Sequence, residues 1–239
     1  MRRLFSLGLF FAILFTALLV WRSRSGSSAR DLSPVGGAVG DGTPSIVKQP
    51  VNFVTKIFDP NNMPGDMPPL PPGEVAECDS DFRSGAIVSG QSRQVDETHA
   101  IVTITNVKVT LQLNINIWIP PDATARVVEH EDGHRQISEY YYKTADKLAA
   151  RIASPYIGKK VEVSGPDLQA ASTKLLEQTG ADITAEYNRE LSTGPAQEFY
   201  DNLTDHSRSD VTVSDAIRAA IQNTSGPGQP PDSASIPAN

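Results

Sequence analysis

The chain has 239 residues, a formal net charge of -7 and one cysteine. This charge excludes ligands that are held by clustered basic residues, so we expect no nucleic-acid partner. A single cysteine cannot form a disulfide within the chain. Without its apolar N-terminus and two Pro/Gly/Ser-rich stretches, the chain retains about 150 residues, enough for one packed domain.

The N-terminus predicts a membrane-targeting segment. Residues 4–21 carry no charge, and this stretch is close to the length that crosses a bilayer. We interpret residues 1–22 as an uncleaved anchor in preference to a cleaved signal sequence, because no small-residue cleavage site precedes Trp21. Basic residues flank the segment on both sides, so the positive-inside rule gives no orientation.

Composition divides the rest of the chain into three parts. Residues 23–77 are rich in Pro, Gly and Ser and are predicted to be a linker, residues 78–222 the folded domain, and residues 223–239 a disordered tail. The apolar stretch at 51–58 interrupts the linker. It is either an edge strand of the domain or an isolated apolar segment, and the sequence favours neither.

Apolar residues at every second position from Val107 to Ile119 predict one long, half-buried strand. Residues 101–104 are expected to pair with it in an antiparallel ribbon that turns near Asn106. Pro120 and Pro121 end the strand.

Two long helices are predicted after this strand. The first is expected to be capped by Asp122 and to run to Ser154, before Pro155. The second occupies residues 168–191 and stops before Gly194. Together the elements indicate an α+β fold in which a small antiparallel sheet packs against the two helices.

The first helix contains the sequence H-E-x-x-H. His130 and His134 are four residues apart and therefore lie on one helix face, where both imidazoles can bind one zinc ion. Glu131 is then placed to take a proton from a zinc-bound water, as in metallohydrolases. Gly133 weakens the helix by about 1 kcal/mol relative to alanine. Its presence is explained either by close approach of another group or by tolerance at the surface.

A catalytic zinc ion usually has three protein ligands, so a third must come from elsewhere in the chain. We favour His206, in the polar stretch at 200–206, where a loop or short helix can fold back over the first helix. Asp201, Asp205 and Glu190 are alternatives, because carboxylates also bind zinc. The remaining histidine, His99, is expected to be structural or exposed.

An H-E-x-G-H helix, a long helical stretch and then Y-D-x-x-T-x-H resemble the bacterial domain of unknown function 922, a family of predicted secreted zinc-dependent proteases within the zincin-like group. The resemblance covers roughly residues 80–210. The family pattern continues with glycine after the last histidine, whereas this chain has Ser207. The matching residues are His130, Glu131, Gly133, His134, Tyr200, Asp201, Thr204 and His206.

The resemblance implies a zincin-like metallopeptidase that hydrolyses a polypeptide outside the cytoplasm. It implies that His206 completes the zinc site and that Tyr200 or Asp201 supports it. Tyr200 is also a candidate catalytic residue, because a phenol near zinc can donate a hydrogen bond to an oxyanion. The domain is then expected in the cell envelope, anchored by one N-terminal helix and facing the periplasm or exterior, or secreted after signal cleavage.

Three alternatives to proteolysis remain open at this point. A metal-binding domain without activity would keep the zinc ligands, and a membrane-tethered protein-interaction module would use the sheet and helices as a contact surface. Hydrolysis of another amide, such as one in cell-wall peptide, requires the same residues. For a protease, residues 108–119 or the partner strand are expected to offer a sheet edge to the substrate.

Overall fold

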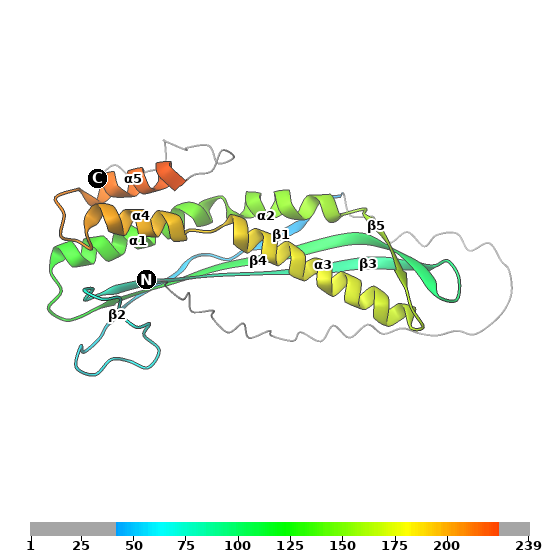
Figure 1. The fold of residues 1–239 in the computed structure, drawn as a ribbon, viewed down its shortest axis with the longest axis horizontal. Coiled ribbons are helices and arrows are strands. Elements are labelled where there is room, and N and C mark those ends of the chain that lie inside the picture. Colours follow the sequence, from blue (N-terminus) through cyan, green and yellow to red (C-terminus); the bar gives the residue numbers. More distant parts are fainter. Residues whose placement is uncertain (1–41, 225–239) are drawn as a thin grey trace. The chain divides into compact units, whose positions relative to one another are not determined.

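The structure is a computed structural model that describes residues 42–224, and in this range the fold is α+β. Five strands form one sheet, and five α-helices and one short 3-10 helix accompany it (Figure 1). In chain order the elements are β1 (Ser45–Lys48), β2 (Asn52–Ile57), β3 (Glu77–Gln94), β4 (His99–Ile119), α1 (Ala125–Lys143), α2 (Ala145–Ala153), η1 (Ser154–Tyr156), β5 (Lys160–Ser164), α3 (Leu168–Glu190), α4 (Gly194–Thr204) and α5 (Val213–Thr224).

The sheet is mixed, so the prediction of an antiparallel sheet is wrong in part. β4 is central: β3 and β5 pair with it in antiparallel orientation, whereas β1 and β2 pair with it in parallel. β1 and β2 lie in the predicted linker, so residues 45–48 and 52–57 belong to the folded domain. For the apolar stretch at 51–58, the edge-strand interpretation is therefore the correct one.

The predicted turn near Asn106 is a β-bulge. The buried positions of β4 change phase there, from Ala100, Val102 and Ile104 to Val107 and every second residue after it. β3 shows a register shift between Ser89 and Gly90, opposite this point. A bulge inserts one unpaired residue. The alternation of side chains between the two faces therefore shifts by one position, while the strand itself continues. β4 is therefore one unbroken strand, and the turn that joins β3 to β4 lies at residues 95–98.

The predicted first helix is two helices. Thr124, and not Asp122, caps α1, because its side chain accepts a hydrogen bond from the Val127 backbone amide at 3.4 Å. Thr144 leaves helical geometry (φ -106°, ψ 10°) and separates α1 from α2. Pro155 lies in η1, beyond the end of α2.

The second predicted helix is confirmed as α3, but two further helices follow it. α4 begins where the predicted stop lies, with Pro195 in its first turn. α5 was not predicted, and it includes the first two residues of the predicted tail at 223–239. The rest of that tail, and the predicted anchor at 1–22, lie outside the described residues.

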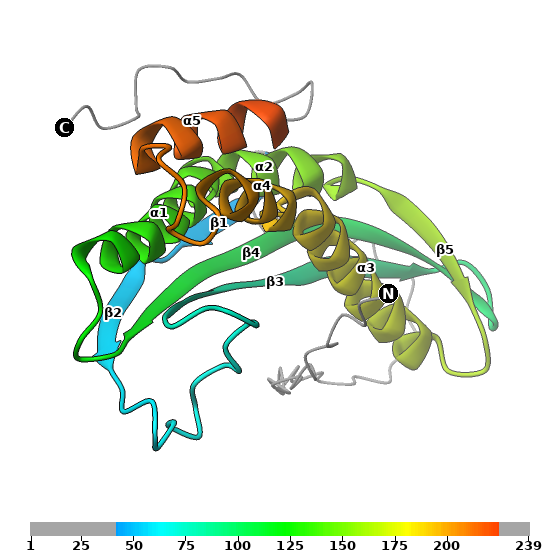
Figure 2. The ribbon, with the colours of Figure 1, turned by 60° about the vertical axis from the view of Figure 1, so that its left-hand side comes forward.

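The helices cover one face of the sheet. On β4 this face carries seven alternating buried residues: Val107, Val109, Leu111, Leu113, Ile115, Ile117 and Ile119. α1 contacts β3 and β4, α3 contacts β3, and α5 packs on α1 and α4 farther from the sheet (Figure 2). Within residues 42–224, no helix is long and apolar enough to cross a membrane.

Candidate metal centre

α1 and α4 bring three potential metal ligands together. His130 and His134 are on α1, and their Nε2 atoms are 3.3 Å apart. Asp201, on α4, places Oδ1 2.8 Å from Nε2 of His134 and 3.4 Å from Nε2 of His130. The three ligand atoms all lie within 4.8 Å of one another.

This group fits a metal ion. Ligand atoms about 2.0–2.1 Å from a tetrahedral zinc ion are about 3.3–3.4 Å apart, which matches two of the three separations. Among the described residues, the buried Oδ1 of Asp201 has no well-aligned hydrogen-bond partner, although it forms close ion-pair contacts with Nε2 of His134 and of His130. A buried acceptor without a partner is costly, and a bound cation would satisfy it. The His130–His134–Asp201 group is therefore compatible with a metal, although the distances do not identify which one.

The electrostatics of the group follow from burial and opposite charge. Burial alone would raise the pKa of Asp201, but the close contacts and charges of His130 and His134 hold that pKa well below its usual range. Burial lowers the pKa of His134, but Asp201 and Gln197 outweigh this effect and the pKa rises to about 9. A metal ion must therefore displace a proton from His134 at neutral pH.

Glu131 is a buried carboxyl group beside the histidine pair. Its residue is 4% exposed, and burial raises the pKa of its carboxyl to about 8. The charge of His134 lowers this pKa, whereas the nearby carboxylates of Glu77 and Glu74 raise it further. A carboxyl group with a pKa in this range can both accept and release a proton near neutral pH.

His206 lies beside the group but outside it. Its Nδ1 atom is 3.9 Å from Oδ1 of Asp201 and 2.9 Å from Oε1 of Glu74, in the loop before β3. It follows the end of α4 in a left-handed turn, in which Asp205, His206 and Ser207 have φ values of 46°, 50° and 71°. The structure therefore places Asp201, an alternative in the sequence analysis, closer to the histidine pair than the favoured His206.

Tyr200 of α4 packs against the imidazole rings of His130 and His134. It is fully buried, its hydroxyl donates to the His130 carbonyl at 3.1 Å, and its ring stacks on the His130 imidazole at 5.1 Å between centroids. In this arrangement the hydroxyl is occupied by the His130 carbonyl, which favours a positioning role for Tyr200, and its catalytic role stays a prediction.

Gly133 is explained by the same ring. A Cβ atom at Gly133 would lie 2.1 Å from the hydroxyl oxygen of Tyr200 and 2.5 Å from Cζ. The glycine therefore lets an aromatic side chain approach α1, and it is not a tolerated surface glycine.

The other residues considered in the sequence analysis form ion pairs away from the metal group. Asp205 is exposed and pairs with Arg208, and Glu190 of α3 pairs with Arg151 of α2. His99 pairs with Asp96 at the turn between β3 and β4, in agreement with the structural or exposed role expected for it.

Three residues near the site were missed by the sequence analysis. Glu74 and Glu77 both lie at the end of the predicted linker at 23–77, where no pattern marked them. Gln197 hydrogen-bonds to His134, with its Oε1 atom 2.6 Å from Nδ1. The four-residue step from Gln197 to Asp201 on one helix face would have pointed to it, had α4 been predicted as a helix.

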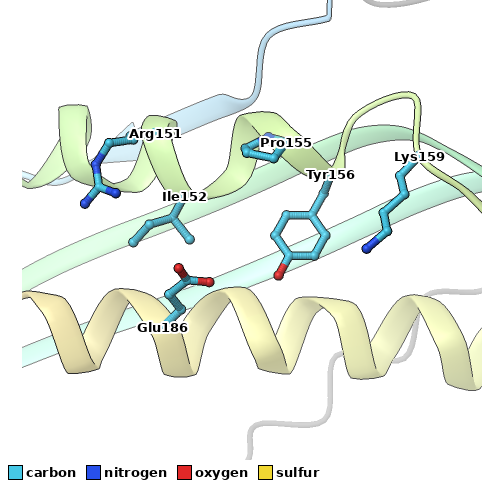
Figure 3. Close-up of a pocket in the computed structure, with 6 residues that line it drawn as sticks. All are labelled: Arg151, Ile152, Pro155, Tyr156, Lys159 and Glu186. Atoms are coloured by element: carbon cyan, nitrogen blue, oxygen red, sulfur yellow. The ribbon is translucent and has the colours of Figure 1, made fainter.

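A separate open pocket of about 460 Å³ lies between the end of α2 and α3 (Figure 3). None of the residues of the metal group contributes to it. It is lined by Arg151, Ile152, Pro155, Tyr156, Lys159 and Glu186.

No protein-family model matches this chain, and no curated protein or solved structure matches it. The similarity of the H-E-x-G-H and Y-D-x-x-T-x-H segments to domain of unknown function 922 therefore stays a prediction.

Proposed function

We propose that the protein is a zinc-dependent metallopeptidase that acts outside the cytoplasm. The observation that carries the proposal is the His130–His134–Asp201 group, which lies on the same helix as the buried Glu131. Two imidazoles and a carboxylate with one open position form a donor set typical of catalytic zinc. The resemblance to the zincin-like protease family supports the same assignment.

The chain's own residues have distinct roles in this proposal. His130, His134 and Asp201 would hold the metal, which supplies Lewis acidity at neutral pH. Glu131, in its carboxylate form, would take a proton from the attacking water and return it to the leaving amine. Tyr200 keeps the helix bearing the histidines at a fixed distance from α4.

His206 is the second candidate for the third ligand. It lies 3.9 Å from Asp201, and the family resemblance assigns the ligand role to it. Replacement of each residue separates the two possibilities. If Asp201 is the ligand, Asp201→Ala lowers zinc affinity far more than His206→Ala does; the reverse order would assign the ligand role to His206.

A polypeptide substrate fits the free edge of β3. β4 has partner strands on both sides, so residues 108–119 offer no free edge to a substrate. Of the two strands that were expected to bind substrate, the partner strand β3 is therefore the candidate. In the described part of the chain β3 pairs only with β4. α3 covers the middle of its outer edge, where the Ala86 amide donates to Thr184 Oγ1 at 3.1 Å. Residues 77–83 remain for strand addition beside α1, where Ser80 bonds to Ser138.

The first experiment is elemental mass spectrometry of the purified full chain. One zinc ion per chain, together with peptide hydrolysis that Glu131→Gln abolishes, is the expected result. One zinc ion without hydrolysis on any peptide would favour the alternative of a tethered zinc-binding module. Absence of zinc after reconstitution would refute the hydrolase and leave a protein-interaction module.

A further inference from the structure

Gln197 of α4 bonds to both the side chain and the backbone of His134. Its Oε1 atom is 2.6 Å from Nδ1 of the imidazole. Its Nε2 atom is 3.2 Å from the carbonyl oxygen of His134 and 3.0 Å from Oγ of Ser138. One amide thus spans the helix turn that carries a proposed metal ligand.

The orientation of this amide is determined by its surroundings. A backbone carbonyl oxygen can only accept hydrogen bonds, so the group that faces the His134 carbonyl must be the NH2 of Gln197. The amide oxygen then faces Nδ1 of His134, and an amide oxygen can only accept. Nδ1 must therefore carry a proton, because otherwise two acceptors would meet at 2.6 Å.

The assignment of Nδ1 leaves Nε2 as the metal-binding nitrogen of His134. Nε2 is the atom that faces His130 and Asp201, at 3.3 and 2.8 Å. α4 therefore contacts both ring nitrogens of His134, one through Gln197 and the other through Asp201.

The amide is itself anchored to the sheet. Ser138 is fully buried and accepts from Gln197, and its hydroxyl donates to Oγ of Ser80 on β3 at 2.9 Å. This chain of hydrogen bonds fixes the imidazole relative to both α1 and β3. Such outer hydrogen bonds set the tautomer and orientation of metal-binding histidines, and their loss typically lowers metal affinity about 10–100-fold.

We propose that Gln197 is a positioning residue of the metal centre, which holds the His134 proton on Nδ1 and so presents Nε2 to the metal. This inference rests on the proposed function for the identity of the metal. The hydrogen-bond pattern itself does not depend on it.

The test compares Gln197→Met and Gln197→Glu in the full chain. Methionine keeps the length of the side chain but removes the acceptor. Glutamate keeps the acceptor for Nδ1 but places a second oxygen against the His134 carbonyl, so it lowers stability. Nitrogen-15 NMR of the metal-free protein at neutral pH detects the proton on Nδ1 of His134 and its hydrogen bond to Gln197, whatever the state of Nε2, and a competition titration reports zinc affinity. Gln178→Met, on an exposed face of α3, is the matched control.

We expect a hydrogen-bonded proton on Nδ1 of His134 in the wild type, the Glu variant and the control, and the loss of this hydrogen bond in the Met variant. Zinc affinity should fall about 10–100-fold in the Met variant and much less in the Glu variant. A purely structural role would instead make zinc affinity follow stability in both variants.

A wild-type His134 without a proton on Nδ1 would overturn the proposal, whether or not the Met variant folds. So would a folded Met variant in which the Nδ1 proton and zinc affinity are both unchanged. If the Nδ1 proton responds as expected but the wild type binds no zinc, the proposed function fails while the hydrogen-bond assignment stands.

Discussion

Replacement of Gly133 by alanine tests the packing of α4 on α1 beneath the metal group. The added Cβ would lie 2.1 Å from the Tyr200 hydroxyl oxygen and 2.5 Å from Cζ. Ordinary contacts of this kind are about 3.5–4.0 Å, so the ring must retreat by more than about 1 Å. Because Tyr200 is fully buried and bonded to the His130 carbonyl, it has no free space into which to move.

The expected magnitude combines three effects. Overpacking costs about 1–3 kcal/mol. Loss of the hydrogen bond from Tyr200 adds about 1 kcal/mol. The gain in helix propensity from glycine to alanine offsets about 1 kcal/mol. We therefore expect Gly133→Ala to lower the free energy of unfolding by about 1–3 kcal/mol, which corresponds to a Tm lower by roughly 2–12 °C.

The assay is thermal and urea unfolding followed by circular dichroism, with zinc affinity measured on the same samples. Zinc affinity should also fall, because movement of Tyr200 shifts Asp201, the next residue on α4. In a double-mutant cycle with Tyr200→Leu, which removes the obstructing atoms, the alanine should cost nothing more. Gly194→Ala is the control, because no atom lies within 4 Å of its added Cβ. A Gly133→Ala protein more stable than the wild type would refute this reasoning.

Three further predictions concern pH, metal and backbone strain. In the metal-free protein the pKa of Glu131 is raised from 4.5 to about 8, so between these pH values the folded state keeps a proton that the unfolded state loses. The free energy of unfolding, measured with urea, should therefore fall as pH rises from 4.5 to about 8. Glu131→Gln should flatten this pH profile. Zinc affinity should rise with pH up to about 9, where His134 loses its proton, and a titration showing pH-independent affinity would contradict this. Ser207→Gly should stabilise the protein by up to about 1 kcal/mol, because a left-handed conformation costs an L-residue about 1–2 kcal/mol and glycine loses about 0.5–1 kcal/mol more entropy on folding; Ser207→Ala should show no such gain in thermal unfolding.

The sequence predicted that His130 and His134 lie on a helix because this signal is local, although it missed the cap at Thr124 and the break at Thr144. The four-residue spacing of His130 and His134 defines one face of a helix whatever surrounds it. The long strand was also predicted, but its bulge was interpreted as a turn, because a change of phase in the alternation looks the same in both cases. The structure distinguishes them through the register of β3 at Ser89 and Gly90.

The proposed third ligand was less predictable because its position depends on where α4 ends. Asp201 lies within the helix and faces α1, whereas His206 follows a left-handed turn at Asp205 that changes the direction of the chain. Three successive non-glycine residues in this conformation follow no common sequence rule. The parallel strand β1 escaped notice because it is short and the proline- and glycine-rich residues around it resembled a linker, whereas β2 lies in the apolar stretch at 51–58, for which an edge strand was one of the two interpretations.

The hydrogen bonds between α1 and α4 have a consequence for how fast an ion held by the His–His–Asp group would be released. Tyr200 and Gln197 bond to residues 70 and 63 positions earlier in the chain. Separation of α4 from α1 would open the His–His–Asp group while leaving the sheet paired, because α4 contributes no strand and packs mainly on α5 and α1. Such local openings occur with lower free energy than global unfolding. Dissociation of a bound ion should then keep pace with hydrogen exchange in α4, and remain faster than exchange in β4.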